Sequence, residues 1–76
     1  MPFIQIKVLE GALSEEKKNE MISKVSQIAA EIEARPYPKE KLLPHTSCII
    51  EEVPSGNWGV GGQPESLETL KALLSG

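Results

Sequence analysis

The sequence predicts a small α/β fold (α+β in some schemes): a βαβ subunit followed by a short C-terminal hairpin and a terminal helix. Two patterns predict it. Residues 3–9 and 47–53 have the composition of strands, and residues 15–34 between them carry apolar residues at helical spacing. The chain has 76 residues, so we expect one domain spanning residues 1–76.

The first strand and the helix are the clearest elements. Residues 3–9 alternate apolar and polar side chains, which is typical of a half-buried strand. Residues 10–13 are expected to turn, and Ser14 is a good N-cap for a helix over 15–34. An apolar stripe on this helix is predicted to be core and consists of Met21, Ile22, Val25, Ile28, Ala29 and Ile32.

The rest of the chain predicts a loop and three short elements. Residues 35–46 are interrupted by prolines and are expected to form a loop with one helical turn around 39–43. Residues 47–53 then form a strand parallel to the first, because strand, helix and strand follow in that order. A glycine-rich hairpin or edge ribbon is expected at 58–62, and a short helix at 65–74.

A subunit of this kind needs partners for stability. A chain this short buries only about 60% of its unfolded surface, and two strands are too few for an independent sheet. Cys48 is the single cysteine and His45 the single histidine, so neither a disulfide nor a usual zinc site is expected. We therefore expect the sheet to be completed by oligomerisation, most simply in a homo-oligomer.

Composition excludes several classes of function. The chain carries eight basic and eleven acidic residues, a net charge of −3, and only three aromatic residues. A nucleic-acid binder would show a basic stripe and stacking side chains. No apolar run approaches the roughly 20 residues of a membrane span, and no signal peptide is visible. We therefore expect a cytoplasmic protein that is not a nucleic-acid binder.

Pro2 is the residue whose chemistry stands out. Initiator methionine is generally removed before proline, so we expect the mature chain to begin with Pro2. Its nitrogen would then be a secondary amine, and α-amino groups titrate at about pH 7.7–8.0 in model peptides. Burial in an apolar pocket lowers that value. A neutral amine of this kind is a capable general base.

Five segments together resemble the 4-oxalocrotonate tautomerase family. Pro2 opens the segment Pro-Phe-Ile-Gln-Ile-Lys-Val-Leu-Glu-Gly, and Leu-Ser-Glu-Glu-Lys-Lys follows at the start of the helix. The remaining matches are Val25-Ser26, Ile49-Ile50-Glu51-Glu52 and Gly56-Asn57-Trp58-Gly59-Val60-Gly61-Gly62. The resemblance covers roughly residues 2–62, and the combination is more specific than any single segment.

The resemblance implies both a fold and an activity. It implies a tautomerase/MIF-like subunit that dimerises and then forms a hexamer. It further implies an isomerase that moves protons on enols and unsaturated 2-oxo acids with Pro2 as general base and with no cofactor or metal. Trp58 matches the family's pocket-lining aromatic position, and the backbone at Leu9 matches a position that holds substrate oxygens.

Two family arginines are replaced here. Ala12 and Ser47 stand where the best-known members carry arginines that bind substrate carboxylates. The only arginine is Arg35, in the loop before the second strand. The same loop holds Lys41 and His45. The candidate substrate-binding positions are therefore Leu9, Lys41, His45, Ser47 and Trp58.

The residues leave other functions open. Without the arginines, the chain could be a catalytically silent oligomeric scaffold or binding module of the same fold. A relative that uses the same proline for hydration or dehalogenation is a further alternative. Trp58 could equally be a packing residue. The natural substrate is not readable from the sequence.

Overall fold

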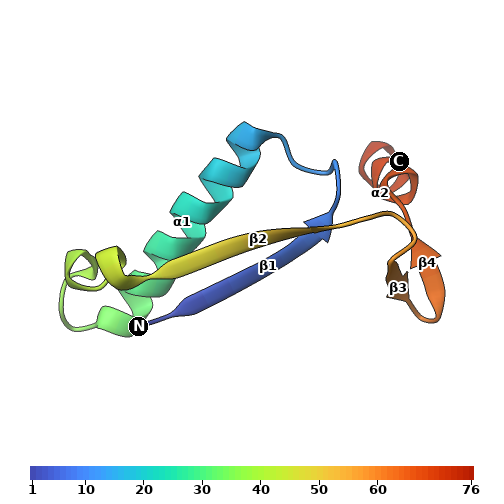
Figure 1. Cartoon of the computed structure of the whole chain (residues 1–76). Coiled ribbons are helices and arrows are strands. Elements are labelled where there is room, and N and C mark those ends of the chain that lie inside the picture. Colours follow the sequence, from blue (N-terminus) through green and yellow to red (C-terminus); the bar gives the residue numbers. More distant parts are fainter.

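A pair of parallel strands forms the centre of the subunit. The computed structural model describes residues 1–76, and in it β1 (Phe3–Leu9) pairs in parallel with β2 (Ser47–Val53). Helix α1 (Glu15–Ala34) connects the two strands and lies along one face of the sheet (Figure 1). The bounds of all three elements are those predicted, so the βαβ unit is confirmed.

Helix α1 is capped at its start, but its last turn lacks a basic residue that would complement the helix dipole. Ser14 adopts extended backbone, and its Oγ accepts a hydrogen bond from the Lys17 amide at 3.2 Å. Acidic residues occupy the first turn, where the helix dipole favours them. No basic residue lies in the last turn, and Pro36 follows, so the helix ends at Ala34.

The loop after α1 differs from the single turn expected around residues 39–43. It forms two consecutive 3₁₀ turns, η1 (Lys39–Lys41) and η2 (Leu43–His45). Pro44 has no amide hydrogen to donate, so one continuous helical segment cannot run through it. The Leu42 amide instead closes the first turn on the Lys39 carbonyl at 2.9 Å.

The glycine-rich segment is a hairpin, but it is longer than predicted. Strand β3 (Trp58–Val60) pairs antiparallel with β4 (Gln63–Glu65). Gly61 and Gly62 form the turn and have φ values of 61° and 82°, a region that favours glycine. Because these glycines form the turn between two strands and do not end the hairpin, strand β4 continues to Glu65.

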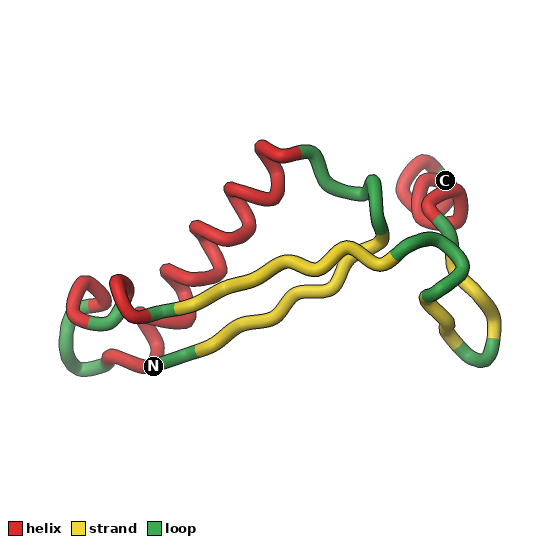
Figure 2. The backbone as a smooth tube through the Cα atoms, in the orientation of Figure 1, coloured by secondary structure: helices red, strands yellow, loops and turns green.

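Helix α2 consequently starts later than the predicted residue 65. It spans Leu67–Ser75, and the Ser66 Oγ caps it by accepting from the Thr69 amide at 3.2 Å. The hairpin and α2 lie beyond the carboxyl ends of β1 and β2, away from the main helix (Figure 2). Neither α1 nor α2 is long and apolar enough to cross a membrane.

The turn between β1 and α1 is fixed to the second strand. Gly11 has a φ of 86°, and its amide donates to a Glu52 carboxylate oxygen at 3.2 Å. The Lys18 amino group also bonds this carboxylate. A Cβ at Gly11 would lie 3.0 Å from the Leu67 Cδ2 atom, so the turn needs glycine for both conformation and space.

The subunit has almost no core of its own. Only Ala30 and Ser26 are buried. Ile28 and Ile32 are 57% and 56% exposed, so the prediction that the whole stripe of α1 is core is wrong within one subunit. Both side chains lie about 200° around the helix axis from the buried Ala30, so they face away from the two strands. The other face of the sheet is also bare, with Phe3 67% exposed.

The overall dimensions agree with an incomplete unit. The subunit measures 44 × 25 × 19 Å, and its radius of gyration is 15.5 Å. A compact chain of this length would have a radius of about 11 Å. Elongation and missing core together indicate that other subunits cover these surfaces.

We predict that an acidic side chain on the bare sheet face disrupts assembly. Ile49, on this face, is 40% exposed in the subunit. Ile49→Glu would place an unpaired charge in the contact that covers the sheet. The parent should sediment at several times 8.3 kDa, and the variant should shift toward smaller species and melt about 5 °C lower or more. A matched Asn19→Glu change on exposed helix surface should leave both readings unchanged. A parent that sediments as a monomer would refute the requirement for partners.

We also predict an acid-sensitive contribution from Glu52. Its hydrogen bond with Lys18, helped by the Gly11 amide, holds the pKa of the Glu52 carboxyl below its ordinary value of 4.5. A lowered pKa stabilises the fold at neutral pH, and this stabilisation is lost as the pH falls through the folded-state value. Glu52→Gln should therefore lower the melting temperature at pH 7 and flatten its decline below about pH 5.

The neighbouring Glu51 provides the control for this prediction. Its carboxylate lies on the opposite sheet face and accepts from the Gln5 side-chain amide. Glu51→Gln removes the same charge without touching the turn. Equal changes in the two acid profiles would contradict a specific role of the contact between Lys18 and Glu52.

Candidate active site

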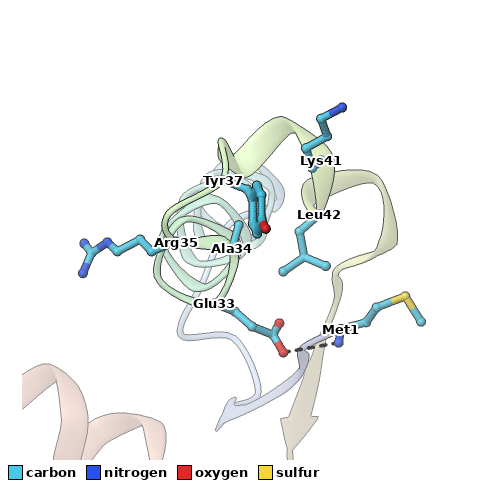
Figure 3. A pocket seen from close by; sticks show the side chains of 7 residues that line it. All are labelled: Met1, Glu33, Ala34, Arg35, Tyr37, Lys41 and Leu42. Carbon is cyan, nitrogen blue, oxygen red and sulfur yellow. Dashed lines mark hydrogen bonds and ion pairs between the residues drawn. The ribbon is translucent and has the colours of Figure 1, made fainter.

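Two hollows lie at opposite ends of the sheet. One has a volume of about 460 Å³ and adjoins the amino terminus (Figure 3). It is lined by Met1, Glu33, Ala34, Arg35, Tyr37, Lys41 and Leu42. The other has a volume of about 570 Å³, is mostly apolar and lies between the end of β1, the hairpin and α2. The predicted site residues divide between these two places.

The chain start is held in the sheet from its first residues. Pro2 is half-buried, and its carbonyl accepts a hydrogen bond from the Ser47 amide at 3.1 Å. Phe3 is already paired opposite Ser47. A group at the Pro2 nitrogen is therefore held at a defined position at the amino-terminal edge of the sheet.

Glu33 is the acidic residue beside the amino terminus. Its Oε1 atom lies 3.3 Å from the Met1 nitrogen, and the dashed line in Figure 3 marks this pair. Arg35 and Lys41 line the same hollow, but their charged groups point away from it in Figure 3. Ala34 and Leu42 lie between them and give the hollow an apolar wall.

The structure places three predicted binding residues at this end of the sheet. Lys41 lies in η1 and lines the hollow. His45 ends η2, and Ser47 begins β2; both are exposed. No group of three or more His, Cys, Asp or Glu side chains converges in a way that could hold a metal ion.

Leu9 and Trp58 lie at the other end. They line the apolar hollow together with Ala12, one of the two positions where the family resemblance led us to expect an arginine. Pro2 and Leu9 are separated by the length of β1, about 20 Å at the rise of an extended strand. Within one subunit, the structure therefore does not bring Leu9 and Trp58 to Pro2.

Sequence reasoning missed Glu33, Tyr37 and Leu42 as residues near the chain start. Tyr37 and Leu42 follow prolines in a loop whose path no periodic pattern predicts. Glu33 did carry a signal. It lies in the last turn of α1, where the helix dipole disfavours acids, and a helix that joins parallel strands ends beside the start of the first strand.

Comparisons with known proteins agree with this fold. A profile of the family described as Tautomerase enzyme matches residues 2–68. A 2-hydroxymuconate tautomerase of Pseudomonas putida is 39% identical over 62 residues, which is 82% of this chain and 87% of that protein. A second 2-hydroxymuconate tautomerase, from Comamonas testosteroni, shows the same identity over the same shares of both chains.

Solved structures show the same architecture. The crystal structure of apo unfused 4-OT superposes with a TM-score of 0.70 at 28% identity and covers 84% of this chain and 93% of its own. A structure from work on 4-oxalocrotonate tautomerase isozymes of Methylibium petroleiphilum gives a TM-score of 0.62 at 40% identity. The coverage is 91% of this chain and 97% of that one.

These similarities establish first the class of fold and then the family of the protein. The fold is that of small α+β subunits with a βαβ core and a C-terminal hairpin and helix. The chain belongs to the tautomerase family. It is an isomerase with tautomerase activity, which implies a small-molecule substrate, and its fold neighbours imply that the open sheet is completed by association of subunits.

Proposed function

We propose that this protein is a cofactor-independent tautomerase of enols and unsaturated 2-oxo acids that uses the amine of Pro2, exposed by removal of Met1, as general base. The observation that carries the proposal is the position of Pro2. It precedes β1 directly, is half-buried and is tied to β2 through its carbonyl. An amine in this position needs little reorganisation to meet a substrate.

The proposed reaction moves one proton. The neutral Pro2 nitrogen accepts the proton of an enol hydroxyl, and the electrons of the O–H bond form the ketone. The carbon–carbon double-bond electrons shift toward the distal carbon of the conjugated system. The protonated amine then delivers its proton to that carbon, so the enzyme returns to its starting state. An amine with a pKa close to the working pH suits both halves of this cycle.

The site itself would be shared between subunits. Trp58 and the Leu9 backbone are at the opposite end of the sheet from Pro2, so a neighbouring subunit must supply them. We propose a homo-oligomer in which dimers associate further into a hexamer. The exposed apolar side chains of α1 and of the bare sheet face support this association.

Loop residues would replace the missing arginines. Lys41 lines the hollow at the chain start, while His45 and Ser47 lie at the same end of the sheet. A lysine attracts a substrate carboxylate as a point charge and lacks the paired donors of arginine. The similar proteins are named for 2-hydroxymuconate, and we propose an enol acid of this general class as substrate. The single cysteine fits a reducing compartment, and we propose the cytoplasm.

We predict that turnover depends on the Pro2 amine. Protein shown by intact mass to lack Met1 should convert phenylenolpyruvate to its ketone, followed by loss of the enol absorbance. Pro2→Ala should lower kcat/KM by about 100-fold, because a less suitable primary amine replaces the secondary amine. Protein that retains Met1 should be inactive, since its Pro2 nitrogen is an amide without basicity.

Assembly provides the control for this experiment. All three proteins should sediment alike, because the hydrogen bond that ties Pro2 to β2 uses its backbone carbonyl, which every one of these proteins retains. Equal rates in the parent, the variant and the Met1-retaining protein would refute Pro2 as the base.

A further inference from the structure

We infer that Glu33 positions the Pro2 amine of the mature chain and stabilises its protonated form. The inference rests on the proposed function, because it requires that Met1 is removed. It assigns a task to a residue in α1 that neither the sequence patterns nor the proposed reaction uses.

The Glu33 carboxylate lies close to the start of the chain. The Glu33 Oε1 atom lies 3.3 Å from the Met1 nitrogen. Three backbone bonds separate that nitrogen from the Pro2 nitrogen, which limits the distance between the two nitrogens to about 3.7 Å. The Pro2 nitrogen therefore lies within about 7 Å of the carboxylate. The Glu33 side chain is 47% exposed, so it is free to turn toward the Pro2 nitrogen once Met1 is removed.

The place of Glu33 in the helix needs an explanation beyond stability. It lies in the last turn of α1, near unpaired carbonyl groups that repel a carboxylate. No basic residue in this turn compensates the charge. The polar partner that the structure gives the Glu33 carboxylate is the amino terminus. An acid that opposes the helix dipole but faces an amine fits a role at that amine.

Other charged groups around the chain start do not take this role. Arg35, which follows α1, and Lys41 of η1 line the hollow with their charged groups turned away (Figure 3). Tyr37 contributes an uncharged phenol, and His45 of η2 is exposed. From β2, the residue nearest in register is the uncharged Ser47. Glu33 is thus the charged side chain that contacts the start of the chain.

This pairing has a defined effect on the reaction. A carboxylate near an amine favours the ammonium form, which is the form that returns the proton to carbon. A hydrogen bond from the amine to Glu33 would also fix the direction of the nitrogen lone pair relative to the hollow. Glu33 is therefore a positioning residue and does not exchange a proton with the substrate.

The test measures the protonation of Pro2 directly. Met1-free protein carrying ¹⁵N-proline is titrated, and the amine nitrogen of Pro2 is followed by NMR. Glu33→Gln removes the carboxylate charge and should move the titration of this nitrogen to lower pH. In parallel, the pH dependence of kcat/KM is measured with phenylenolpyruvate, and each profile is divided by its own maximum. On the acidic side of the profile, this relative kcat/KM should be about threefold higher in Glu33→Gln than in the parent.

Glu31→Gln is the matched control, because it removes the same charge from the same helix about 200° away around its axis. It should leave the Pro2 titration where it is in the parent. Equal titrations in the parent and Glu33→Gln, or equal shifts in both variants, would overturn the inference. The titration needs no turnover, so a shift specific to Glu33→Gln upholds the inference even if Pro2→Ala shows that the proposed reaction is wrong.

Discussion

The structure depends on the parallel pairing of two strands that cannot bury their own faces. β1 and β2 are covered on one side by α1, yet only Ala30 and Ser26 become buried. Apolar side chains on the outer part of the helix and on the bare sheet face remain in water, at a cost of roughly 25 cal/mol for each Å² of apolar surface. Association removes this cost, so folding and assembly of the subunit are coupled.

Parallel pairing also decides where the chemical groups lie. The starts of β1 and β2 share one edge, which brings Pro2 and Ser47 together. Helix α1 runs back toward this edge and ends there, so Glu33 reaches the chain start. The carboxyl ends of the strands share the other edge, where Trp58 of the hairpin meets Leu9. The candidate site residues of one subunit therefore divide between two places, about the length of β1 apart.

The sequence predicted the regular elements well and their surroundings less well. Residues 3–9, 15–34 and 47–53 have the correct bounds, because alternation and helical spacing are local signals that the folded chain keeps. The end of the hairpin was wrong, since Gly61 and Gly62 can either end a ribbon or turn it. The exposure of Ile28 follows from how α1 is rotated on the sheet, and the contact of Glu33 follows from tertiary packing. The rotation of α1 on the sheet is not visible in a local pattern, whereas the unfavourable position of Glu33 in the last turn of the helix is.

In the arrangement that we propose, neighbouring subunits complete each other's active site, and this can be tested by mixing two variant subunits. Pro2→Ala and Trp58→Ala chains with different tags are co-expressed, and oligomers that contain both are purified. If Pro2 of one subunit works with Trp58 of another, both native residues should be present in about a quarter of the sites after random assembly. Activity should then exceed that of either variant alone by a corresponding amount. Activity no greater than the mean of the two variants would show that both residues serve a site within one subunit and contradict the account.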